Sequence, residues 1–135
     1  MAVQLGVLCR DARLNTIETH LGTSPILTIK TGAAPANCGT ANSGTVLATI
    51  TLPSDWMLAA ASGSKAMSGS WTQASANAGG TALHFRIHTN PGNVCEMQGT
   101  VSNTGGGGDL KLDNDVIVAG QTVTITAFTL TDGNA

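Results

Sequence analysis

The chain has 135 residues, only 10% of them are charged, and the net charge is -2. A single domain of this length buries roughly 70% of its unfolded surface, so a hydrophobic core can form without disulfide or metal staples. The near-neutral charge excludes the basic surface that binds nucleic acid or anionic membrane, and charged residues are far scarcer than the ~25% of a typical domain.

Threonine, serine, asparagine and glycine supply most of the polar surface. This composition favours β structure, because β-branched side chains fit a pleated strand. The scarcity of charge has two interpretations. Either the outer faces of the sheets are simply rich in hydroxyl groups, or neighbouring subunits cover those faces, since interface cores are depleted in charge.

The three cysteines, Cys9, Cys38 and Cys95, are an odd number at irregular spacing. They match no zinc-ligand pattern and predict no disulfide framework, so we expect a chain made in a reducing cytoplasm, with Cys95 as a small core hydrophobe. The apolar run at the N-terminus is too short for a secretion signal or a membrane span. We therefore expect a leaderless chain that is soluble when made.

Residues 1–8 are apolar and weakly patterned, which predicts an N-terminal arm or a short strand. A helix is expected within residues 9–22, because an apolar stripe there has helical spacing: Leu14, Ile17 and Leu21. Asp11 is expected to cap the start of this helix, and Gly22 to take the left-handed conformation after its end. Residues 131–135 are expected to form a C-terminal tail.

The remainder of the chain predicts strands separated by turns and by a loop of small residues at 32–44. The expected strands are 26–30, 45–52, 55–61 paired with 65–72, 81–88 paired with 94–101, 109–112, 115–118 and 121–130. In the last strand, Phe128 follows the outward-facing threonines, which indicates a shift in the alternation or burial on both faces. The segment 102–108, SNTGGGG, is expected to be a flexible link that cannot pack. About eight strands at short spacing predict an all-β fold, an antiparallel β-sandwich or jelly roll, in a single domain of residues 1–135.

The hairpin that turns at residues 89–93 is the centre of the predicted sheet. The apolar alternation predicts a register in which Ile87 lies opposite Cys95. That register places Arg86 opposite Glu96 on the other face, and a slip of one residue would destroy both features.

Few residues suggest chemistry. His84 and His88 share a strand face at about 13 Å, too far apart to bind one metal ion, so we expect a solvent-facing polar row there. Asp109, Asp113 and Asp115 lack the spacing of a calcium loop and are expected to stabilise turns. The chain carries no catalytic motif, so we predict no enzyme, no catalytic residue, no cofactor and no metal.

The chain has two tryptophans, Trp56 and Trp71, and no tyrosine. The tryptophans are interpreted as core or interface anchors, with a shelf for sugar rings as the alternative. The residues expected to contact partner subunits are Val3, Leu5, Trp56, Trp71, Asp132 and Asn134.

The two ends of the chain carry a resemblance. The motifs are Ala12-Arg13-Leu14 followed by Ile17, then Gly108-Asp109-Leu110, and the closing Asp132-Gly133-Asn134-Ala135. Together they resemble a group of small tailed-bacteriophage proteins of similar length, which are encoded among virion structural genes. The likeness covers nearly the whole layout, whereas the three cysteines and the segment 95–99, CEMQG, depart from it. The resemblance implies a virion structural component and carries no catalytic residues.

We therefore expect a capsid decoration (cement) protein that is made in the host cytoplasm and lies on the capsid surface of the virion. Its expected partners are the major capsid protein or other virion subunits, and further copies of itself, for example in a trimer. The alternatives are a tail or head–tail connector protein, and a carbohydrate-binding module of a tail tip that uses Trp56 or Trp71. Each copy is expected to act by burying neutral surface between coat subunits.

Overall fold

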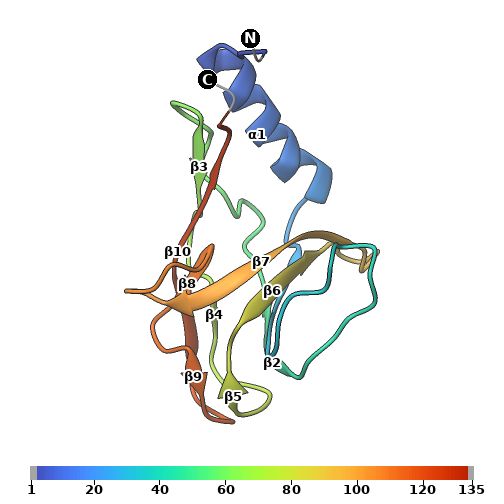
Figure 1. Ribbon diagram of the computed structural model, residues 1–135, viewed down its shortest axis with the longest axis vertical. Coiled ribbons are helices and arrows are strands. Elements are labelled where there is room, and N and C mark those ends of the chain that lie inside the picture. The colour runs from blue at the N-terminus through green and yellow to red at the C-terminus, as the bar shows by residue number, and fades with distance from the viewer. Residues whose placement is uncertain (1–2, 134–135) are drawn as a thin grey trace.

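A computed structural model describes residues 3–133 of the chain (Figure 1). The described part holds one helix, α1 (Val7–Leu21), followed by ten strands. The strands are β1 (Ile26–Lys30), β2 (Val46–Thr51), β3 (Ser64–Ala66), β4 (Thr72–Gln73), β5 (Gly80–Thr81), β6 (His84–His88), β7 (Cys95–Asn103), β8 (Leu110–Leu112), β9 (Val116–Ile117) and β10 (Val123–Thr131). Within residues 3–133, no helix combines the length and the apolar character that crossing a bilayer requires.

Eight of the strands form one curled sheet, in the order β2-β1-β6-β7-β8-β10-β3, with β4 also pairing with β10. β5 and β9 form a separate two-stranded sheet at the end of the molecule opposite α1 (Figure 1). Every pair is antiparallel except β7 and β8, which run parallel. The predicted all-β fold with one short N-terminal helix, similar to a β-sandwich or jelly roll, is confirmed.

The core is built around four aromatic side chains from distant segments. The ring centroids of Trp56 and Trp71 are 6.0 Å apart, those of Trp71 and Phe128 are 5.6 Å apart, and those of Phe128 and Phe85 are 5.5 Å apart. These are the tilted and edge-on spacings that aromatic rings prefer. The Trp56 indole N–H also donates to the Gly22 carbonyl at the end of α1, so the aromatic core fixes the base of the helix.

The helix begins at Val7, inside the segment expected to be an arm, so that expectation is wrong for its last two residues. Asp11 does not cap the helix. Its carboxylate instead accepts a hydrogen bond of 2.8 Å from the Gly63 N–H. Gly22 ends the helix as predicted: its φ is +80°, which favours glycine, and its N–H donates to a carbonyl of the last turn.

The predicted central hairpin forms from β6 and β7, but its register differs by two residues. Ile87 pairs with Met97 rather than with Cys95. A shift of two keeps the apolar side chains on their predicted face, so the alternation cannot distinguish the two registers. The expected opposition of Arg86 and Glu96 is wrong, because β7 contains a bulge in which Glu96 is the extra residue.

The glycine segment 102–108 is packed, so its prediction as a flexible link is wrong. Its first residues extend β7, and the chain turns back at once so that β8 lies parallel to the end of β7. The Gly108 N–H donates to the Ser102 hydroxyl at 2.9 Å. A Cβ atom at Gly108 would lie 2.5 Å from the Ser102 backbone nitrogen, so only glycine allows this close approach.

The segment expected to be a strand at residues 55–61 forms only isolated bridges, Met57 to Met67 and Ala61 to Ser64. The segment still lies beside β3, as the predicted pairing implied. Two features prevent a continuous ladder here. Pro53 lies just before the segment, and β3 forms its ladder with β10 instead.

The last predicted strands form with partners that the sequence did not indicate. β8 pairs with β7 and β10, and β9 pairs with β5. In β10 the pairing is irregular between Ile125 and Ala127, and Phe128 enters the core. The predicted shift in alternation at Phe128 is therefore confirmed.

Candidate functional site

The residues expected to contact partners lie in very different environments. Trp56 and Trp71 are 0% exposed, so the expectation that they touch a neighbour or hold a sugar is wrong, and they serve the core. Val3 is 82% exposed and Leu5 is half-buried. Asn134 lies outside the described residues.

Asp132 is buried and bound within its own chain. Its carboxylate pairs with Arg13 Nε at 3.2 Å, and its carbonyl accepts a hydrogen bond of 3.2 Å from Arg10 Nη1. Its N–H donates to the Gly63 carbonyl at 3.0 Å. The C-terminal tail expected at residues 131–135 is therefore part of the fold at its start, because Thr131 ends β10 and Asp132 joins the end of β10 to α1.

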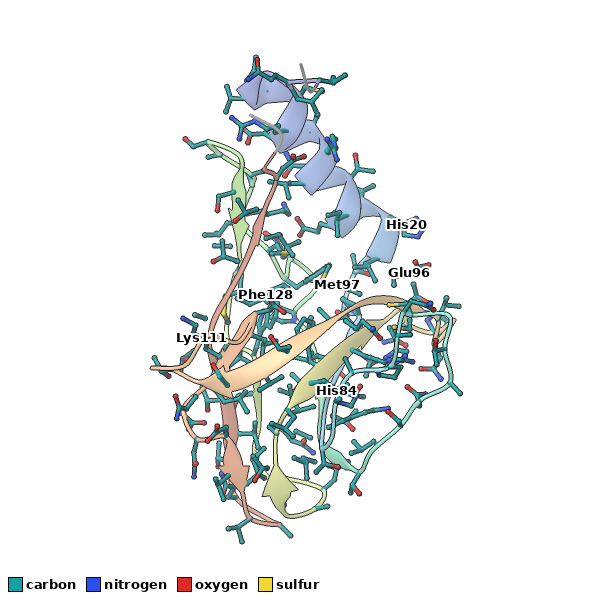
Figure 2. All side chains as sticks on the ribbon, viewed as in Figure 1. His20, His84, Glu96, Met97, Lys111 and Phe128 are labelled. Carbon is teal, nitrogen blue, oxygen red and sulfur yellow. The ribbon has the colours of Figure 1, made fainter. Side chains whose placement is uncertain are left out.

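An open groove runs between α1 and the sheet. It consists of three adjoining hollows: about 550 Å³ between α1 and the end of β10, about 430 Å³ between β7 and β10, and about 240 Å³ between α1 and β7. We call it the α1 groove and define it by its central residues: Leu14, Ile17, Leu21, Met97, Leu130 and Thr131. Figure 2 places Met97 and Phe128 on the sheet side, with His20 and Glu96 where α1 approaches β7.

The α1 groove has an apolar floor, whereas its rim carries polar side chains such as Thr16, Gln98 and Thr129. Of the predicted helical stripe, Leu14 and Leu21 are buried, whereas Ile17 remains half-buried and lines two of the three hollows. One end is closed by the ion pair between Arg13 and Asp132 described above. At the other end His20 Nε2 lies 3.1 Å from a Glu96 carboxylate oxygen.

β7 presents the backbone groups of one residue, Gln98, to the α1 groove. The Val101 N–H donates to the Leu83 carbonyl on the β6 side. Because hydrogen-bonded pairs alternate along an antiparallel ladder, the N–H and C=O of Gln98 point away from β6. Among residues 3–133, no strand pairs with β7 at this position.

β10 presents a second unpaired edge on the other side of the same groove. The Met67 N–H donates to the Phe128 carbonyl on the β3 side, so the backbone groups of Thr129 and Thr131 point the other way. Only β8, which is three residues long, joins β7 to β10, and beyond it the two strands diverge. Two strand edges therefore face one apolar groove, an arrangement that can accept an extended peptide.

Polar contacts hold the helical wall of the groove in place. Lys65 is 1% exposed, and its Nζ lies 2.7 Å from the Glu18 carboxylate. The same ammonium donates to Asn15 Oδ1 and to the Leu58 carbonyl, both at 2.8 Å. Asn15 also accepts from the Ala60 N–H at 2.9 Å. α1 is thus fixed to the segment before β3 by a buried ammonium with three partners.

A second candidate site is a group of buried basic side chains, which we call the basic cluster: Lys30, His84, Arg86 and His88. The polar row of β6 was expected to face solvent, and this expectation is wrong. The loop at residues 32–44 folds over that face, while Phe85 and Ile87 on the opposite face lie in the hydrophobic core, so all five residues of β6 are buried.

Arg86 is the anchor of this loop. Its Nε donates to Gln98 Oε1 at 3.1 Å and its Nη1 to Asn42 Oδ1 at 3.1 Å. Its Nη2 donates to the carbonyls of Asn37 at 3.1 Å and Thr40 at 2.9 Å. A planar guanidinium with several N–H groups can satisfy this many acceptors at once, which an ammonium cannot do in the same geometry.

Among residues 3–133, no carboxylate forms a salt bridge with the cations of the basic cluster. Burial lowers the pKa of Lys30, and the charge of Arg86 lowers it further. The pKa of His88 is likewise lowered, first by burial and then by Lys30 and Arg86. His84 Nδ1 lies 2.7 Å from the Gly32 carbonyl and therefore donates to it. These contacts indicate that the basic cluster holds the loop at residues 32–44 in place. They include no pair of a nucleophile and a base.

The sequence contains one signal for the basic cluster. A loop rich in asparagine and free carbonyls directly follows β1, and the polar face of β6 lies beside β1. The sequence contains no such signal for the α1 groove, because the groove depends on where β8 ends in the folded sheet.

No three His, Cys, Asp or Glu side chains among residues 3–133 come together as metal ligands. Asp109 accepts hydrogen bonds of 2.9 Å from the N–H and hydroxyl of Thr100, and Asp113 accepts from the Asn114 N–H, as expected of aspartates that stabilise turns. Comparisons with protein-family models, with curated proteins and with solved structures found no match.

Proposed function

We propose that the chain is a structural subunit of a bacteriophage virion, and specifically a capsid decoration (cement) protein that binds the assembled head. The observation that carries the proposal is the α1 groove, where an apolar floor lies between two unpaired strand edges. The resemblance of the chain ends to virion structural proteins supplies the setting.

The occupant of the groove is an extended, uncharged segment of a neighbouring coat subunit. Backbone groups at Gln98, Thr129 and Thr131 would pair with such a segment as an added strand, and Ile17 and Met97 would contact its side chains. A charged segment is disfavoured because the charged side chains at the ends of the groove already have partners: Arg13 pairs with Asp132, and Glu96 contacts His20.

Decoration follows from this chemistry by mass action. A protein that binds the assembled lattice, and does not bind free coat subunits, stabilises the lattice in proportion to its occupancy. A stable contact needs on the order of 1,000 Å² of buried surface, so neighbouring copies or a second contact must add to the groove. The exposed apolar residues near the start of α1, Val3, Val7 and Leu8, are candidates for that second contact.

The test is to purify particles from the host and to measure the number of copies of this chain by quantitative mass spectrometry, with imaging of labelled particles. Decoration predicts a copy number comparable with that of the major capsid protein, located on the head. A copy number equal to the subunits of one small ring per particle, located at the neck or tail, would favour the connector alternative. Absence from particles would refute the virion role altogether.

A matched pair of variants tests the groove itself. Ile17→Glu places a charge on the half-buried groove wall, whereas Thr19→Glu places the same charge on the exposed helix face. We expect Ile17→Glu to reduce incorporation into particles at least tenfold and Thr19→Glu to leave it unchanged. Equal incorporation of both folded variants would show that the groove is not the contact.

A further inference from the structure

Two cysteines that are distant in sequence meet at the edge of the covering loop. Cys38 lies in the loop at residues 32–44 and Cys95 begins β7, and their Sγ atoms are 2.8 Å apart. Both side chains are half-buried and both are free thiols. Two sulfur atoms that are not bonded rarely approach so closely, so the fold itself brings these two thiols into reacting distance.

We propose that Cys38 and Cys95 form a redox pair that oxidises to a disulfide and so ties the covering loop to β7. The disulfide bond is about 2.05 Å long, so the sulfur atoms need to approach by only about 0.8 Å.

The loop is already positioned for this bond by contacts at two residues just before Cys38. The Asn37 carbonyl accepts from Arg86 Nη2 at 3.1 Å, and the Pro35 carbonyl accepts from Gln98 Nε2 at 2.6 Å. Both donors come from β6 and β7, the hairpin that also carries Cys95 opposite His88. The disulfide would thus preserve an arrangement that hydrogen bonds have already formed.

The oxidant is a low-molecular-weight disulfide of the glutathione class. The Cys95 thiolate attacks one sulfur of that disulfide, forms a mixed disulfide and releases one thiolate. The Cys38 thiol then loses its proton and attacks the Cys95 sulfur, which expels the second thiolate. Two cysteine thiols lose two electrons and two protons, and the small disulfide is reduced to two thiols.

The order of attack follows from the surroundings of Cys38. Burial and the adjacent Cys95 side chain raise the pKa of Cys38 to about 11, so Cys38 remains a thiol at neutral pH. The first attack therefore falls to Cys95, and Cys38 acts as the resolving cysteine. Cys9, on the exposed part of α1, has no such partner and provides an internal comparison.

The experiment uses the purified full chain, so it is independent of any role in a virion. The reduced protein is incubated with glutathione disulfide under native conditions, then denatured and alkylated, and its intact mass and peptides are measured. We expect a cross-linked peptide pair that joins Cys38 and Cys95, whereas the exposed Cys9 ends either alkylated or as its glutathione adduct. Alkylation of both Cys38 and Cys95, or glutathione retained on Cys95 in the wild type, would overturn the proposal.

Single variants provide the control. In Cys38→Ser the resolving thiol is missing, so Cys95 should accumulate as a stable glutathione adduct. Cys9→Ser should form the Cys38–Cys95 disulfide as the wild type does. The oxidised wild type should melt roughly 10 °C above its reduced form, because the bond closes a ring over residues 38–95. An unchanged melting temperature in a protein shown to be cross-linked would refute the claim that the bond stabilises the loop.

Discussion

The buried ion pair between Lys65 and Glu18 leads to an asymmetric prediction. Removing either partner breaks the same contact of 2.7 Å, but the charge left behind differs in its surroundings. The Lys65 side chain is 1% exposed, whereas that of Glu18 is 22% exposed. Glu18→Gln therefore leaves an ammonium that water cannot reach, and Lys65→Met leaves a carboxylate that water can reach.

The magnitudes follow from this difference in hydration. Breaking a fully buried pair costs about 3 to 5 kcal/mol when the remaining charge is uncompensated. Glutamine retains one acceptor for Lys65, so we expect Glu18→Gln to lower the free energy of unfolding by about 2 to 3 kcal/mol. Lys65→Met keeps an apolar stem of similar volume and removes the buried charge, so we expect a loss of about 1 kcal/mol or less.

Urea denaturation followed by tryptophan fluorescence measures both values, because Trp56 and Trp71 are fully buried in the folded state. The melting temperatures should fall by roughly 8 °C for Glu18→Gln and by 4 °C or less for Lys65→Met. The double variant should resemble Lys65→Met alone, since no buried charge remains in it. A larger loss for Lys65→Met than for Glu18→Gln would refute the reasoning.

Three further predictions concern the glycine segment and the basic cluster. Gly108→Ala should cost about 1 to 3 kcal/mol in urea denaturation, because its Cβ would lie 2.5 Å from a backbone nitrogen of β7, whereas Gly107→Ala, with no atom within 4 Å, should cost far less. Arg86→Lys should cost about 2 to 4 kcal/mol and should accelerate hydrogen exchange in the loop at 32–44, since an ammonium cannot replace four guanidinium contacts. Burial, Lys30 and Arg86 lower the pKa of His88, so below pH 6.5 the unfolded chain binds a proton that the folded chain does not bind. The free energy of unfolding should therefore decrease as the pH is lowered below 6.5, by at most about 1.4 kcal/mol per pH unit. In His88→Asn this decrease should be less steep.

The sequence could predict the parts of the fold that local chemistry determines. β1 begins and ends where expected, Gly22 ends the helix, and the shift at Phe128 is present, because each depends on neighbouring residues alone. The register of the β6–β7 hairpin could not be predicted, since a shift of two residues leaves the apolar face intact. There the bulge at Glu96 decides the register, and the partner of Glu96 lies on α1, 76 residues away in the chain.

Burial of the basic cluster does not follow from the strand pattern alone, for a related reason. The alternation along β6 identifies which side chains share a face, but it does not reveal what covers that face. The covering loop at 32–44 consists of small residues that look like a mobile connection. Its backbone carbonyls, which every sequence supplies, satisfy Arg86. A long loop beside a strand that carries Arg and His is therefore a reason to expect a covered face.

The α1 groove is a consequence of how the sheet ends, which makes it a preformed surface. β8 cannot extend further along β7, because the residue before it, Asp109, turns its carboxylate back to the N–H and hydroxyl of Thr100. Gly99 permits this turn, since a Cβ there would lie 2.8 Å from both the Asp109 carboxylate and the Phe85 ring. The divergence of β7 and β10 is thus fixed by packed atoms. This chain therefore has little of its own backbone left to order when a peptide enters the groove. Preorganisation of this kind would raise the affinity for the proposed coat segment, because it lowers the entropic cost of binding.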